Sequence, residues 1–158
     1  MNENSQGDTL NAQHKFPLIV AWLGYCGLLP FLFLAVLANA DTAHGLLYRS
    51  ALFSYGAIIL SFVGALHWGF AMALSGLTEK QRQTCFGWSV IPALIAWSTC
   101  MLGPAATSCV LTLGFLLQFW RDLSLSRQCS LPAWFLPLRM RLTAVACLSL
   151  IIGFFSLT

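Results

Sequence analysis

Charged side chains are what this sequence most clearly lacks. Asp, Glu, Lys and Arg make up 8% of its 158 residues, whereas 58% of the residues are hydrophobic. A soluble domain of average composition carries about 25% charged residues, which supply its polar surface. This composition excludes an ordinary soluble fold and predicts a membrane protein.

The motifs of common enzyme classes are also absent. The sequence contains no phosphate-cradling loop, no H-E-x-x-H zinc motif and no paired carboxylates, and Gly87-Trp88-Ser89 lacks the second glycine of a nucleophile elbow. None of the six cysteines forms a C-x-x-C pair, so the sequence predicts neither a metal site nor a disulfide framework. It favours a protein that is not an enzyme, and it identifies no cofactor. The net charge is +3, but the basic residues are scattered along the chain and form no cluster, which argues against a nucleic-acid partner.

Long apolar runs are what the sequence does contain. About 20 apolar residues in a helix cross the roughly 30 Å of bilayer hydrocarbon. The runs predict an all-α integral membrane bundle of five transmembrane helices, at about 17–38, 49–74, 85–102, 105–120 and 138–157. Residues 1–15 are polar and predict a disordered tail, which leaves 16–158 as a single polytopic membrane domain.

The end of the first run resembles a signal-peptidase site. Ala38-Asn39-Ala40 has the small-x-small pattern that precedes cleavage. The apolar run is nevertheless longer than the about 7–15 residues of a signal-peptide core, and Lys15 is its only basic flank. A retained first helix is therefore favoured.

Basic residues predict the orientation of the five helices. Lys and Arg concentrate in cytoplasmic segments of inner-membrane proteins. With five spans, one side of the membrane receives Lys15, Lys80, Arg82, Arg121, Arg127, Arg139 and Arg141, and the other receives Arg49 alone. The N-terminus is therefore predicted to be cytoplasmic and the C-terminus outside, and the acidic residues of the tail favour a bacterial inner membrane over a mitochondrial one.

The second run carries small residues on two faces. Helices in lipid associate where small residues allow close approach. One predicted packing ladder is Ala57, Ser61, Ala65 and Gly69, and a different face holds Gly56, Gly64, His67 and Ala71. Neighbours on both sides are expected, so we predict that this helix is central.

His67 is the one histidine within a predicted span. Ionisable residues inside a membrane are costly and often functional. A ligand-binding or proton-handling role competes with a structural one, in which a neutral imidazole bonds to a carbonyl or to Ser61, Ser89 or Ser98. The sequence leaves both open.

Other polar and aromatic positions allow two interpretations each. Pro92 frees a backbone carbonyl, which either shapes a packing kink or lines a cavity. Trp68, Trp88 and Trp97 either pack or flank a flat cofactor. Arg121-Asp122 is interpreted as a solvated helix end rather than as a functional ion pair.

Four strings of residues resemble one known family. They are Gly27-Leu28-Leu29-Pro30-Phe31, the segment from Tyr55 to Gly69, Pro92-Ala93-Leu94-Ile95-Ala96-Trp97, and the segment from Leu131 to Arg139. Together they resemble the transmembrane protein 69-like family, a domain of unknown function found in bacteria and in organisms with mitochondria. The "S-F-x-G-x-x-H-W-G" string that ends at Gly69 is the most specific, and the resemblance covers about residues 17–157.

The resemblance implies a small polytopic membrane protein with a retained first helix, but no activity. It draws together the positions expected to matter, which are His67, Trp68, Pro92, Trp97, Trp134 and Arg139. Phe135 departs from the family, which often has tyrosine there, and this weakens any hypothesis that needs a phenolic hydroxyl.

Three functions follow as hypotheses. The sequence has many small residues suited to helix packing and few reactive side chains. This favours a non-enzymatic factor for the assembly or stability of other membrane proteins. The first alternative is a binder or carrier of a hydrophobic or redox cofactor such as quinone, which would use His67 and nearby tryptophans. The second is a transporter or channel, which would need a homo-oligomer because five short helices enclose little volume.

Overall fold

The structure is a computed structural model that describes residues 18–41, 43–129 and 131–155. Within these ranges the chain is helical and has no strand. The helices are α2 (Leu18–Cys26), α3 (Leu29–Ala40), α4 (Gly45–Ala73), α5 (Glu79–Ser98), α6 (Pro104–Gln128) and α7 (Phe135–Phe155), with a short 3-10 turn η1 (Thr99–Met101) after α5. The predicted polar tail, residues 1–15, lies outside the described residues.

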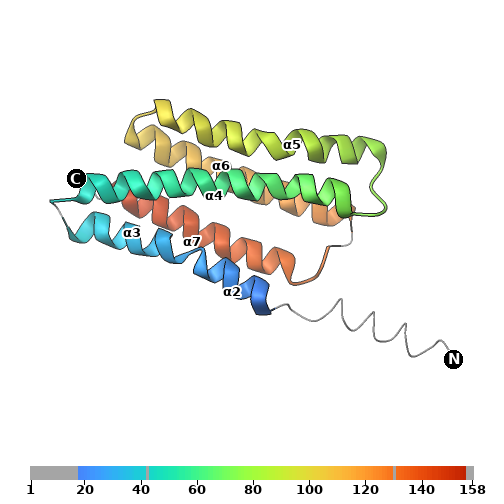
Figure 1. Cartoon of the computed structure of the whole chain (residues 1–158), viewed down its shortest axis with the longest axis horizontal. Coiled ribbons are helices and arrows are strands. Elements are labelled where there is room, and N and C mark those ends of the chain that lie inside the picture. Colours follow the sequence, from blue (N-terminus) through green and yellow to red (C-terminus); the bar gives the residue numbers. More distant parts are fainter. Residues whose placement is uncertain (1–17, 42, 130, 156–158) are drawn as a thin grey trace.

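Helix α4 lies at the centre of the bundle. It contacts α3, α5, α6 and α7, and the long helices run side by side along one axis (Figure 1). Its buried face contributes Leu52 and Leu60 to a core that also contains Phe31, Leu111 and Leu150. The prediction of a central second helix is confirmed.

The first apolar run is a broken helix rather than a continuous one. Pro30 stands in the first turn of α3 and has no N–H to donate to the preceding turn, so α2 ends at Cys26. The Tyr55 hydroxyl of α4 donates to the Gly27 carbonyl at the break, at 2.8 Å. This bond ties the break to the central helix.

The predicted spans were too short for two of the helices. Helix α5 begins at Glu79 because Thr78 forms a capping box with Gln81, in which the Thr78 N–H donates to Gln81 Oε1 at 2.8 Å. Helix α6 was predicted to end at residue 120 but continues to Gln128. In both cases polar residues extend a helix beyond its apolar part.

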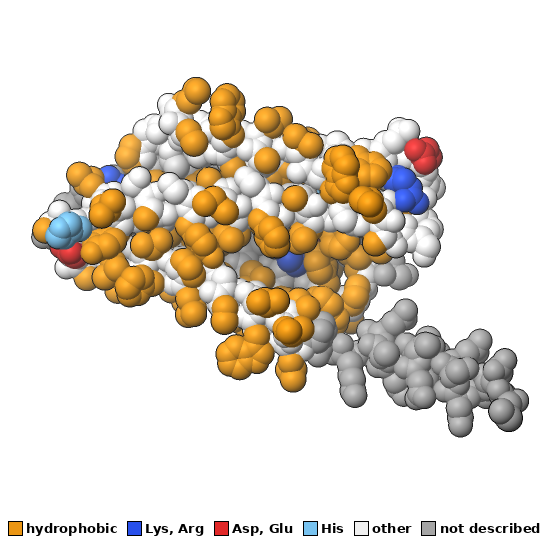
Figure 2. Space-filling model, in the orientation of Figure 1, with side chains coloured by type: hydrophobic (Ala, Val, Ile, Leu, Met, Phe, Trp, Pro, Cys, Tyr) orange, Lys and Arg blue, Asp and Glu red, His pale blue; other side chains and the backbone are white. Residues whose placement is uncertain are grey.

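Four segments of the described chain are long and apolar enough to cross a membrane, namely Leu18–Ala40, Gly45–Ala73, Glu79–Met101 and Phe135–Phe155. Helix α6, which holds the predicted fourth span, is not among them. On the face shown in Figure 2, hydrophobic side chains are spread along the whole length of the bundle, and most of the charged side chains lie near its two ends. This is the surface of a multi-pass membrane protein, in which lipid replaces water around the middle of the bundle.

Candidate functional site

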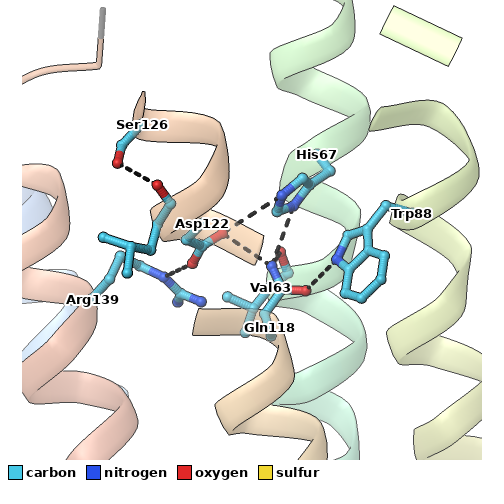
Figure 3. A network of polar contacts seen from close by, with 8 residues as sticks. Val63, His67, Trp88, Gln118, Asp122, Ser126 and Arg139 are labelled. Atoms are coloured by element: carbon cyan, nitrogen blue, oxygen red, sulfur yellow. Dashed lines mark hydrogen bonds and ion pairs between the residues drawn. The ribbon is translucent and has the colours of Figure 1, made fainter. Parts of the chain in front are cut away.

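A buried polar cluster joins four helices at one end of the bundle. It consists of His67 from α4, Trp88 from α5, Gln118 and Asp122 from α6, and Arg139 from α7 (Figure 3). His67 is fully buried, and Asp122 and Gln118 are 2% and 1% exposed. We refer to these five residues as the polar cluster.

An ion pair anchors the polar cluster. Arg139 Nε donates to Asp122 Oδ2 at 2.7 Å, which connects α7 to α6. Asp122 is 2% exposed, so its charge is nearly removed from water. Buried charges are tolerated only when they are paired and hydrogen-bonded. The interpretation of Asp122 as part of a solvated helix end was therefore wrong.

Gln118 connects the remaining members of the polar cluster. Its Oε1 accepts from Trp88 Nε1 at 2.9 Å, and its Nε2 donates to Asp122 Oδ1 at 3.2 Å. Gln118 Nε2 also lies 3.2 Å from His67 Nδ1. Because the Gln118 amide donates to Nδ1, a neutral His67 ring carries its proton on Nε2. Nε2 lies 3.7 Å from Asp122 Oδ1.

The serines that the sequence offered to His67 do not bond to it. The hydroxyl groups of Ser61, Ser89 and Ser98 each donate to a carbonyl of their own helix, those of Ala57, Phe86 and Ile95. Such bonds to the preceding turn are common for serine in helices. His67 finds its partners on α6 instead.

A lateral groove lies next to the polar cluster. It has a volume of about 500 Å³ between α2, α3, α4 and α7. Its wall is apolar except at one end, where Arg139 and Thr143 line it together with Trp134. Leu23 and Phe62 on its rim are exposed, so the groove opens toward the lipid.

The predicted functional residues fall into two groups. His67 and Arg139 are buried in the polar cluster, and Trp134 lines the lateral groove near Arg139. Trp68 and Trp97 are 51% and 61% exposed, so neither belongs to the buried polar cluster that contains His67.

Pro92 packs against α4. A Cβ atom added to Gly64 would lie 2.7 Å from both Cβ and Cγ of Pro92, so α4 and α5 are in close contact at these two residues. The face with Gly56, Gly64, His67 and Ala71 is buried. Of the predicted ladder, Ala57 and Ser61 are half-buried, whereas Ala65 and Gly69 are exposed and do not form the expected packing face.

Sequence reasoning missed Gln118 and the roles of Trp88 and Asp122. Gln118 and Asp122 are four residues apart and so lie on one face of α6, together with the buried Leu111 and Phe115. That spacing was a usable signal. The pairing of Asp122 with Arg139 could not be predicted, because no local sequence pattern links a residue of α6 to a residue of α7.

Comparison with known proteins gives a family but no activity. Residues 16–155 match a family described as a protein of unknown function, DUF3429. The chain is 34% identical over 146 residues to transmembrane protein 69 of Xenopus tropicalis, which covers 90% of this chain and 56% of that protein. The chain therefore spans little more than half the length of this relative. No solved structure matches.

Proposed function

Since the chain belongs to the transmembrane protein 69-like family, a multi-pass membrane family of unknown function (DUF3429), we propose that it binds a lipid-like amphiphile in the lateral groove. The amphiphile carries a headgroup with an oxygen acceptor, such as a quinone carbonyl, and an apolar tail. Family membership confirms the resemblance found in the sequence but supplies no ligand.

One observation carries this proposal. Arg139 lines the lateral groove, and its Nη2 atom is buried without a hydrogen-bond partner among the described residues. Its Nε is already used by Asp122. A buried guanidinium N–H without an acceptor is costly. Arg139 is 9% exposed, and a rotation of its guanidinium toward the groove would bring this N–H to a headgroup oxygen.

The rest of the groove suits an apolar tail. Its volume of about 500 Å³ is within the roughly 300–1,000 Å³ of ordinary ligand pockets. It runs along α7 from Arg139 past Leu142 to Ala146, and side chains of α3 and α4 close the other sides. His67 does not line the groove, so in this proposal it positions Asp122 and Gln118 and does not touch the ligand.

Filling the groove is expected to remove the amphiphile. Leu142 lines the groove, whereas Leu148 is on the same helix but 59% exposed on the outside. Protein extracted in native lipid discs and analysed by mass spectrometry should carry one amphiphile per chain in the wild type and in Leu148→Trp, and little in Leu142→Trp. A wild type without an enriched amphiphile, or equal amounts in both variants, would contradict the proposal. The mass identifies the headgroup class.

We also propose that the chain crosses a bacterial inner membrane five times, with α6 as the fourth crossing. Helix α6 has 25 residues and packs along α4, α5 and α7. Its low hydropathy has a physical reason, because Gln118 and Asp122 are buried in the bundle and do not face lipid.

Reporter fusions test this topology. An N-terminal fusion and one within residues 75–78 should report the cytoplasm, and a C-terminal fusion should report the outside. Both termini in one compartment would mean that a helix, most simply α6, does not cross.

A role in the assembly of other membrane proteins remains a second proposal. The exposed Ala65 and Gly69 of α4 are small residues that would let a helix of another membrane protein approach closely. The same lipid-disc preparation should then contain a membrane protein in stoichiometric amount, which Gly69→Leu should release. The prediction of an oligomeric transporter stays a prediction.

A further inference from the structure

A second pocket lies at the opposite end of α4 from the polar cluster. Its volume is about 280 Å³, and it is enclosed by the start of α4, by η1 and by the start of α6. Its lining differs from that of the lateral groove because Ser50, Ser54, Thr99 and Thr107 contribute hydroxyl groups. We refer to it as the α4 pocket.

Arg49 is the only charged residue that lines the α4 pocket in the described part of the chain. It is 6% exposed, and no described residue forms a hydrogen bond or ion pair with its side chain. The acidic residue nearest to Arg49 in the sequence, Asp41, is hydrogen-bonded to His44 instead. Asp41 Oδ2 lies 2.9 Å from His44 Nδ1, and this side-chain hydrogen bond holds the pKa of Asp41 below its usual value.

The start of α6 adds positive potential to the same pocket. Pro104 and Thr107, from the first turn of this 25-residue helix, line the pocket. Pro104 has no N–H, and the Thr107 N–H donates to the Gly103 carbonyl at 2.9 Å, so these residues offer no free N–H to the pocket. The helix dipole is nevertheless positive at this end of α6. A helix N-terminus beside an arginine is an arrangement that binds anions.

We propose that the α4 pocket binds a phosphate group. The planar guanidinium of Arg49 matches two oxygens of a phosphate, and the hydroxyl groups of Ser50 and Ser54 can donate to the others. The group comes either from a phospholipid at this surface of the membrane or from phosphate in solution. This site is separate from the lateral groove and does not depend on the function proposed for it.

Thermal unfolding of the purified full chain distinguishes the two sources. Inorganic phosphate in an uncharged detergent tests the free anion, with chloride at the same ionic strength as the reference. Discs of phosphatidylglycerol against discs of an uncharged glycolipid, which has no phosphate, test the lipid. Stabilisation by inorganic phosphate identifies a free-anion site, and stabilisation by phosphatidylglycerol alone identifies a headgroup site. A wild type that responds to neither overturns the proposal.

Two variants assign the response to the α4 pocket. Arg49→Met should raise the phosphate or lipid concentration needed for half of the stabilisation by at least about tenfold. Ser54→Trp fills the pocket from its exposed rim, leaves Arg49 in place, and should have the same effect. Arg127→Met removes one exposed basic residue at the other end of the bundle and should respond like the wild type. Equal responses in Arg49→Met, Ser54→Trp and Arg127→Met would show unspecific attraction and overturn the proposal.

Discussion

Replacing Asp122 with alanine should destabilise the protein by about 3–5 kcal/mol, because the substitution leaves the buried charge of Arg139 without its counterion. The same substitution removes the ion pair that links α6 to α7, and it takes away the carboxylate oxygen to which Gln118 of the same helix donates. The loss should appear as a lower midpoint of thermal unfolding in a mild detergent.

A double substitution separates the cost of an unpaired charge from the cost of a lost contact. Replacing a whole buried ion pair by apolar residues of similar size is often neutral or stabilising. Asp122→Leu combined with Arg139→Met should therefore recover most of the stability that Asp122→Ala loses. If the double variant is as unstable as the single one, packing and not charge explains the loss.

Exposed acidic residues provide the control. Glu79, at the start of α5, is exposed, and among the described residues its side chain is bonded only by Gln83 of its own helix, at 3.3 Å. Glu79→Ala should change stability by no more than about 0.5 kcal/mol. A loss for Asp122→Ala that is equally small would mean that the carboxylate is not buried as the structure has it.

The double variant also bears on the proposed amphiphile. It should fold without the guanidinium that lines the lateral groove, and it should therefore lose the amphiphile while the groove keeps its apolar wall. Retention of the same amphiphile would show that Arg139 does not bind the headgroup.

The helices could be predicted from the sequence because each depends on its own apolar run. Apolar length predicts α4 and α7 to within a few residues, since a helix in lipid must form its hydrogen bonds within itself. The ends were less predictable. Helix α5 begins six residues before the predicted 85, because Thr78 and Gln81 form a cap that a hydropathy window does not detect.

The polar cluster could be predicted only in part because its members meet through tertiary packing. His67 and Arg139 stood out individually, one as a histidine within a span and the other as part of a family string. Asp122 was assigned to solvent because it directly follows Arg121 at the end of an apolar run. Its partner is Arg139, which reaches it only after the chain has turned from α6 into α7.

The close contact of α4 with α5 gives the second large expected effect. Gly64 lies against the ring of Pro92, and a Cβ atom at position 64 would be 2.7 Å from two ring carbons. A proline ring cannot move aside by changing rotamer as a long side chain can. Gly64→Ala should therefore separate the two helices and cost about 1–3 kcal/mol, as overpacking of a core does.

Gly69 provides the matched control on the same helix. A Cβ atom there would meet nothing within 4 Å, and alanine is favoured over glycine inside a helix by about 1 kcal/mol. Gly69→Ala should thus leave the unfolding midpoint unchanged or raise it, while Gly64→Ala lowers it. Adding Pro92→Ala to Gly64→Ala removes Cγ and Cδ of the ring but leaves Cβ, so it should restore part of the loss and not all of it. Equal unfolding midpoints for the two glycine variants would mean that α4 and α5 are not in close contact at Pro92. Because α5 carries both Pro92 and Trp88, the position of Trp88 in the polar cluster would then also be in question.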